Sequence, residues 1–270
     1  MAELRQYLNT MNGMLESVGY HRPRAVFTDF VEVYAVALAN VFLASEELDE
    51  RYRRIMAKYK ESDRVLFPRL HAQLVCALTD YPSDVLGQLY MEMDASSSKL
   101  GQFFTPQSIT DLLARLSVPD VQQLHRTLAE VGFINSHEPA AGGGALVIAQ
   151  AFHLLDLGIN YQQYYHALAI DIDLTAVHMA YLQLSLLHIP ATVVHGNALT
   201  LEEHSRWYTP AFYMGAFDPK LRRGYALGSL KDQEVRDLAC HTEQVEEDGL
   251  LITNNGRRDD FPGLSAQPGA

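Results

Sequence analysis

The sequence predicts an α/β protein in which a parallel β-sheet is covered by helices and preceded by an all-helical domain. In the first third of the chain, apolar residues recur at helical spacing, for example at Leu4, Leu8 and Met11. Beyond Gly101, short apolar runs alternate with helical segments in a βαβαβ order, which is typical of a parallel sheet. With 270 residues, of which 48% are hydrophobic and 20% charged, the chain can bury a substantial core.

Changes in pattern divide the chain into two domains and a tail. The helical domain is predicted to span residues 1–94, and Ser83 or Asp84 is expected to cap its last helix. Residues 95–255 are expected to form the α/β domain. Residues 256–270 have the composition of a flexible tail.

Turn and capping signals place the elements of the α/β domain. Thr105 is expected to cap its first helix, with Pro106 at the first helical position. Helices are expected at 107–116, 120–131, 145–157 and 174–188, and strands at a run ending near 137, at 166–170 and at 191–194. Farther along, 200–228 is expected to be irregular, 229–244 helical and 249–253 a further strand.

Composition narrows the class of protein. A net charge of −12 argues against a chain that binds nucleic acid without a partner, because most non-specific affinity comes from basic side chains that neutralise phosphates. Cys76 and Cys240 form no metal or disulfide pattern, and the histidines show no zinc spacing, so no metal site is expected. The apolar stretch 31–44 is shorter than the roughly 20 residues of a membrane span, and the N-terminus lacks a signal pattern. We therefore expect no membrane association and a cytoplasmic location.

The glycine-rich turn at residues 138–144 is the first candidate for a binding site. A glycine turn between a strand and a helix lets backbone N–H groups approach a phosphate or a carboxylate closely. The spacing GxGxxG is not met, and such turns also serve purely structural ends. The turn alone is therefore compatible both with a ligand-binding role and with a purely structural role.

Polar residues at the ends of the next two strands strengthen the binding hypothesis. Asp171 is placed to accept the hydroxyls of a ribose, because ligands of parallel sheets bind outside the carboxyl ends of the strands. Asp173 is the competing candidate, although it also suits a helix cap. Asn197 offers a carbonyl oxygen to an adenine amine, or it stands in a turn because asparagine tolerates left-handed backbone. Three strand ends are thus predicted to converge on one crevice.

Four motifs follow one another along the chain: GQFFTP at 101–106, EPAAGGGAL at 138–146, the strand end at Asp171 and GNAL at 196–199. In this order they resemble the cofactor motifs of N6-adenine DNA methylases, most closely those of the modification subunit of type I restriction-modification systems. The resemblance covers about residues 84–200. It implies a Rossmann-like methyltransferase fold that depends on S-adenosyl-L-methionine (SAM).

The resemblance also implies roles for the matching residues. Phe104, Thr105 and Pro106 would line the methionine end of SAM, and the turn would wrap the amino-acid portion. Asp171 would hold the ribose and Asn197 would face the adenine. The expected cofactor-binding residues are Phe104, Thr105, Pro106, Glu138, Pro139, Ala140, Gly142, Gly144, Asp171 and Asn197.

The chain departs from this family at the catalytic motif, (Asn/Asp)-Pro-Pro-(Tyr/Phe), which nothing in the sequence matches. The nearest string is Thr209-Pro210-Ala211-Phe212, so Thr209, Pro210 and Phe212 are the candidate catalytic residues. In the family mechanism the first residue accepts a hydrogen bond from the target amine and the aromatic ring stacks on a flipped base. The competing interpretation of Phe212 is a core aromatic.

Two functions follow as hypotheses. The first is a SAM-dependent DNA methyltransferase of the adenine-N6 type that reaches DNA with a separate specificity protein and could form an oligomer. The second is a non-catalytic SAM-binding protein that regulates or decoys a restriction or methylation complex. A methyltransferase that acts on a substrate other than DNA is a further alternative.

Overall fold

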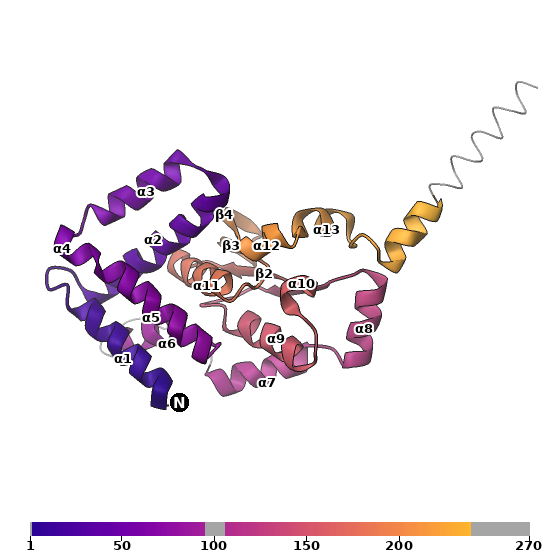
Figure 1. Ribbon diagram of the computed structural model, residues 1–270, viewed down its shortest axis with the longest axis horizontal. Helices are drawn as coiled ribbons and strands as arrows, with labels where there is room; N and C mark the ends of the chain where they lie inside the picture. Colours follow the sequence, from indigo (N-terminus) through magenta and orange to yellow (C-terminus); the bar gives the residue numbers. More distant parts are fainter. Residues whose placement is uncertain (1, 95–105, 239–270) are drawn as a thin grey trace, which may run out of the picture.

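The computed structural model describes residues 2–94 and 106–238. The first range consists of six helices, which form the indigo to purple part of Figure 1. They are α1 (Ala2–Glu16), α2 (Pro23–Leu43), α3 (Glu46–Met56), α4 (Glu61–Arg64), α5 (Leu66–Asp80) and α6 (Val85–Asp94). The described part of this range holds no strand, which confirms the predicted all-helical character.

Helix α2 is longer and more apolar than the sequence analysis expected. It has 21 residues, and its most apolar 18-residue window has a mean hydropathy of 1.7, so by length and composition alone it is long and apolar enough to span a membrane. Half of that apolar window is buried inside the protein, and Asp29 accepts hydrogen bonds from Lys58 and Tyr59 within the fold. A half-buried helix whose internal carboxylate is hydrogen-bonded within the fold is consistent with a helix packed against the core of the protein.

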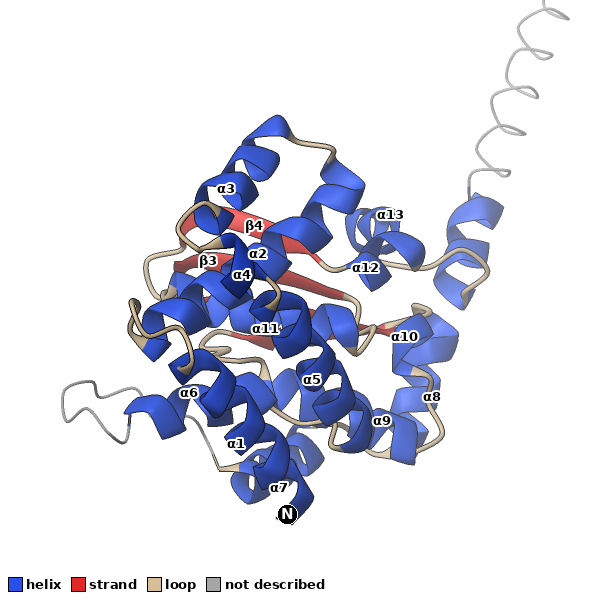
Figure 2. Ribbon diagram, turned by 60° about the vertical axis from the view of Figure 1, so that its left-hand side comes forward, coloured by secondary structure: helices blue, strands red, loops and turns tan. Residues whose placement is uncertain are grey.

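The second range carries the sheet and the remaining helices. The helices are α7 (Gln107–Ser117), α8 (Val121–Glu130), α9 (Ala145–Asp156), α10 (Tyr161–Tyr164), α11 (Leu174–Leu186), α12 (Pro210–Met214) and α13 (Phe217–Arg223), and residues 230–238 are also helical. The strands are β1 (Ile134–Glu138), β2 (Tyr165–Asp171), β3 (Ala191–Asn197) and β4 (Glu202–Tyr208). They are drawn in red in Figure 2, and their order in the sheet is β1-β2-β3-β4. The first three are parallel, as predicted.

Strand β4 corrects the expectation that residues 200–228 are irregular. It pairs antiparallel with β3, from Asn197 opposite Glu202 to Thr192 opposite Tyr208. The residues Glu-Glu-His-Ser-Arg are mostly exposed, because β4 lies at the sheet edge and only its end reaches the core. Such a polar strand carries little of the apolar signal by which strands are recognised in a sequence.

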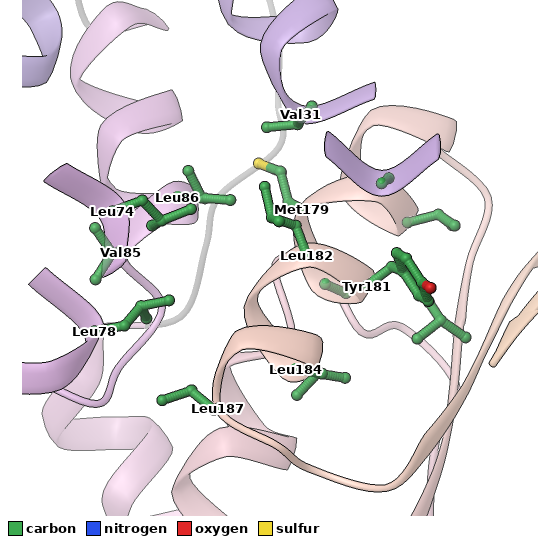
Figure 3. Packing of buried hydrophobic residues seen from close by; sticks show 14 of the residues in the cluster. Val31, Leu74, Leu78, Val85, Leu86, Met179, Tyr181, Leu182, Leu184 and Leu187 are labelled. Carbon is green, nitrogen blue, oxygen red and sulfur yellow. The ribbon is translucent and has the colours of Figure 1, made fainter. Parts of the chain in front are cut away.

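Helix α11 joins the helical range to the sheet. It contacts β2 and β3 on one side and α2, α5 and α6 on the other. Its residues from Ala176 to Ser185 are all buried, so its sequence is apolar around most of its circumference. In Figure 3, Leu182 and Met179 of α11 lie near Leu86, Leu74 and Val31 from the helical range. The two ranges therefore share one continuous core, and whether residues 1–94 fold as a separate domain stays a prediction.

Candidate cofactor site

The glycine turn connects β1 to α9 in a conformation that requires glycine. Gly142 has φ 54° and Gly144 has φ 92°, both in the left-handed region that residues with a side chain rarely adopt. The turn is closed by a hydrogen bond from Gly144 N to the oxygen of Ala141, and it is tied to β2 by a bond from Ala141 N to the oxygen of Ile170. The turn therefore lies at the carboxyl end of the sheet, as predicted.

Asp171 at the end of β2 is bonded to this turn. One carboxylate oxygen accepts from Gly142 N at 2.8 Å and the other from Asp173 N at 2.9 Å. Asp173 instead caps α11, because its Oδ1 accepts from Thr175 N at 2.7 Å. The geometry thus assigns the two aspartates different tasks, and Asp171 is the one that belongs to the turn.

Asn197 closes β3 and caps the turn that follows. Its Oδ1 accepts from Leu199 N at 2.9 Å and from Thr200 N at 3.3 Å. The oxygen that was expected to receive an adenine amine is therefore already engaged by the backbone. The Nδ2 amide hydrogens are the groups that this side chain can offer to a ligand.

Register brings the three strand ends together. Glu138 of β1 lies opposite Ala169 of β2, and Asp171 lies opposite His195 of β3. Glu138 folds back on the turn, with its Oε1 accepting from Ala140 N at 3.1 Å. Pro139 and Ala140 are exposed at the mouth of the turn. The expected residues at the carboxyl end of β1, β2 and β3 thus occupy one edge of the sheet, while their individual roles toward SAM stay predictions.

The first cofactor motif is only partly within the described residues. Phe104 and Thr105 lie outside them. Pro106 is exposed and directly precedes α7, where its oxygen accepts from Ile109 N and Thr110 N. It therefore stands one position before the helix, rather than at the first helical position that was expected.

Thr209 lies at the opposite end of the sheet from the glycine turn. Its hydroxyl donates to the oxygen of Ile189 at 2.8 Å and accepts from the N–H of Ala191, the first residue of β3, at 2.9 Å. The side chain is fully buried at 0% exposure. Because β4 runs antiparallel to β3, it returns the chain to the amino ends of the parallel strands. This placement corrects the expectation that Thr209 borders the cofactor crevice.

Phe212 and Pro210 share that placement. Pro210 begins α12, and the ring of Phe212 is 3% exposed in a small aromatic cluster with Phe133 and Phe217. Buried His166 lies against the same rings. Phe212 is thus a core aromatic, and the expected catalytic set of Thr209, Pro210 and Phe212 forms no amine site in this structure.

Asp84 and Gln183 are neighbours of the turn that the sequence analysis did not assign to the site. Asp84 caps α6 as predicted, because its Oδ1 accepts from Gly87 N at 2.7 Å. The same oxygen accepts from Gln183 Nε2, which also donates to the oxygen of Gly143. Burial raises the pKa of the Asp84 carboxyl above its usual range. The sequence shows a capping signal at Asp84 and a helical position at Gln183, and neither feature indicates that the two residues meet at the turn.

Within residues 2–94 and 106–238, no group of three or more His, Cys, Asp or Glu side chains is arranged to hold a metal ion.

Three solved structures are similar to this chain. A protein from Listeria monocytogenes, described as a class I SAM-dependent methyltransferase, is 14% identical, with 73% of this chain and 53% of that chain covered and a TM-score of 0.41. The type I restriction-modification methyltransferase subunit from Streptococcus thermophilus is 18% identical, with coverages of 63% and 38% and a TM-score of 0.33. A DrdV complex with DNA is 14% identical, with coverages of 70% and 21% and a TM-score of 0.31.

The chain spans about half or less of the length of these three proteins. No curated protein matches it significantly. The sequence profile of the family N-6 DNA Methylase matches residues 81–218, which is just over half of the chain and includes the glycine turn, Asp171 and Asn197. The chain therefore belongs to the N-6 DNA methylase family.

Proposed function

We propose that this protein binds SAM at the carboxyl ends of β1, β2 and β3 and acts as a SAM-dependent DNA methyltransferase of the adenine-N6 type, related to type I modification subunits. The observation that carries the proposal is the hydrogen bond between Gly142 N and the Asp171 carboxylate, which makes the turn and the acidic strand end one structural unit. The family match spans both residues.

The residues present fit the chemistry of SAM. A carboxylate has about four lone-pair positions, so Asp171 can accept ribose hydroxyls while it keeps its bonds to Gly142 and Asp173. The twelve-residue helix α9 begins directly after the turn, and its first N–H groups favour a carboxylate such as that of the amino-acid portion. The Nδ2 group of Asn197 suits a ring nitrogen of adenine. Bound SAM supplies the methyl group.

The amine site is the part that these residues do not supply. Thr209 and Phe212 are buried at the other end of the sheet. Methyl transfer therefore needs groups from outside the described ranges or from a second protein. With a net charge of −12, this chain is also expected to reach DNA with a separate specificity protein, which would present the flipped adenine.

The buried position of Thr209 and Phe212 also favours a second candidate function. A protein that keeps the cofactor turn but lacks an amine site would bind SAM without catalysis and would regulate or decoy a restriction or methylation complex. Its acidic charge suits a protein partner better than free DNA. A cytoplasmic location stays a prediction under both functions.

A methylation assay separates the two functions. The purified chain is incubated with labelled SAM and several DNA substrates, alone and with lysate from the native host that has been depleted of this chain. The enzyme hypothesis predicts labelled N6-methyladenine in at least one of these reactions, and the Asp171→Ala variant should lose it. SAM binding without incorporation under either condition would support the non-catalytic function. Label in protein or RNA instead of DNA would reveal a different substrate.

A further inference from the structure

A buried polar network links helix α6 to the glycine turn. Asp84 is 4% exposed and Gln183 is 0% exposed, although 98 residues lie between them in the sequence. The amide of Gln183 uses both of its donor hydrogens, one toward Asp84 Oδ1 and one toward the oxygen of Gly143, each at 2.8 Å. Its Oε1 accepts from Leu86 N at 3.0 Å. The orientation of this side chain is therefore fixed from three sides.

Gly143 has no room for a side chain because Asp84 occupies that space. A Cβ on Gly143 would lie 2.7 Å from Asp84 Cγ, closer than real Cβ atoms come to other heavy atoms. The turn thus packs directly on the carboxyl group. A shift of the turn toward α6 would collide with Asp84, and a shift away would break the bond between Gln183 and the oxygen of Gly143.

The turn is consequently held by hydrogen bonds at two neighbouring residues. Gly142 N is bonded to Asp171, which lies at the proposed ribose end of the site, and the Gly143 oxygen is bonded to Gln183. Within the described part of the chain, Asp84 is held by hydrogen bonds and not by an ion pair. A buried carboxyl without a cation costs stability compared with an apolar side chain, and its hydrogen bonds to Gly87 and Gln183 offset that cost.

We propose that Asp84 and Gln183 are positioning residues that hold the Gly142–Gly144 turn in the position in which it receives the amino-acid portion of SAM. The inference rests on the proposed SAM site and extends it to helix α6 of the helical range. It means that the helical range takes part in cofactor binding, although neither positioning residue touches the cofactor. A disturbance of α6 would then weaken SAM binding through the Asp84 contact.

The test compares two ligands that use different parts of the site. S-adenosylhomocysteine carries the amino-acid portion, whereas adenosine carries only the ribose and the base. Gln183→Leu keeps the size of the side chain but removes its hydrogen bonds, and Asp84→Ala removes the contact with Gly143. In calorimetry of the full chain, both variants should bind S-adenosylhomocysteine roughly ten- to a hundred-fold more weakly and adenosine about as well as the unaltered protein.

Two further variants serve as controls. Asp84→Asn keeps an oxygen that accepts from Gly87 and Gln183, so it should restore affinity to within about threefold. Gln88→Ala removes a side chain of the same helix that, among residues 2–94 and 106–238, bonds to the backbone oxygen of Asp84 and to no other group, so it should leave the affinity for both ligands unaffected. Circular dichroism and thermal unfolding confirm that each variant is folded before its affinity is measured. A variant that is not folded at 25 °C is measured at a lower temperature beside the unaltered protein.

Three results would overturn the inference. Unchanged affinity for S-adenosylhomocysteine in both Gln183→Leu and Asp84→Ala would show that the network does not position the turn. Equal losses for the two ligands would indicate a general structural role. If the unaltered protein bound neither ligand, the proposed function would fail together with this inference, whereas normal binding by the unaltered protein and by both variants would overturn this inference alone.

Discussion

The backbone N–H of Gly142 donates a 2.8 Å hydrogen bond to the carboxylate of Asp171, which lies 29 residues farther along the chain. This bond joins the turn after β1 to the end of β2, at the edge where ligands of parallel sheets bind. Gly142 can adopt its left-handed φ of 54° because it lacks a side chain. The conformation of the turn and the position of the acidic group therefore depend on each other.

Phe212→Ala should lower stability without affecting SAM binding. The ring is 3% exposed among Phe133 and Phe217, so its removal should lower the free energy of unfolding by about 3–5 kcal/mol. Urea unfolding followed by fluorescence measures this loss. Tyr213→Ala on the same helix is the control and should cost less, because that ring is 38% exposed. A Phe212→Ala protein of unchanged stability that fails to bind SAM would contradict the placement of this ring in the core, away from the cofactor site.

Gly143→Ala should lower both stability and SAM affinity. The new methyl group would overlap Asp84, and such overpacking costs about 1–3 kcal/mol. Gly13→Ala in α1 is the control, since a Cβ there meets no atom within 4 Å and alanine favours a helix by about 0.5–1 kcal/mol. Thermal unfolding with and without SAM distinguishes the two effects. Equal stabilities of the two variants would contradict the close packing of the turn on Asp84.

Stability should fall when the pH is lowered from 6.5 to 5. Burial lowers the pKa of His166 to about 4, whereas an unfolded histidine has a pKa of about 6.5. In this window the unfolded chain binds a proton that the folded chain does not bind, so the free energy of unfolding decreases by up to about 1.4 kcal/mol per pH unit. His178, whose pKa burial lowers to about 3, contributes in the same direction.

Urea unfolding at a series of pH values measures this slope. His166→Gln retains a donor and an acceptor for Asn135 and Thr192 but has no titrating ring, so its slope should be smaller than that of the unaltered protein. Identical slopes would show that His166 does not remain neutral inside the fold.

Local signals in the sequence predicted much of the fold. The parallel strands and the helices between them were recognisable because each carries its own periodicity or cap, as Asp173 does for α11. Asp171 was found for the same reason, since it directly follows an apolar strand. Its place beside the glycine turn followed from the rule that the strand ends of a parallel sheet meet at one edge, whereas its hydrogen bond to Gly142 was not predicted.

The features that the sequence did not predict correctly depend on contacts between distant parts of the chain or on strands without an apolar pattern. β4 is a polar edge strand, and its antiparallel direction is set by the short turn after Asn197 rather than by any periodicity. Once that direction was missed, Thr209 was assigned to the wrong end of the sheet. The contact between Asp84 and Gln183 was missed because each residue has a sufficient local explanation, a helix cap and a buried helical position, and only the packing of α6 against α11 brings them together.

Calorimetric titration of the full chain with SAM tests whether SAM binds at the carboxyl ends of β1, β2 and β3. We expect one binding site and a loss of about 1–3 kcal/mol of binding free energy in Asp171→Ala, because the ribose hydroxyls would lose their acceptor. Affinity should be nearly unchanged in Asp173→Ala, which removes a helix cap worth about 1 kcal/mol of stability. No heat of binding from the unaltered protein at millimolar SAM, or an Asp171→Ala variant that binds as tightly as the unaltered protein, would contradict SAM binding at these strand ends.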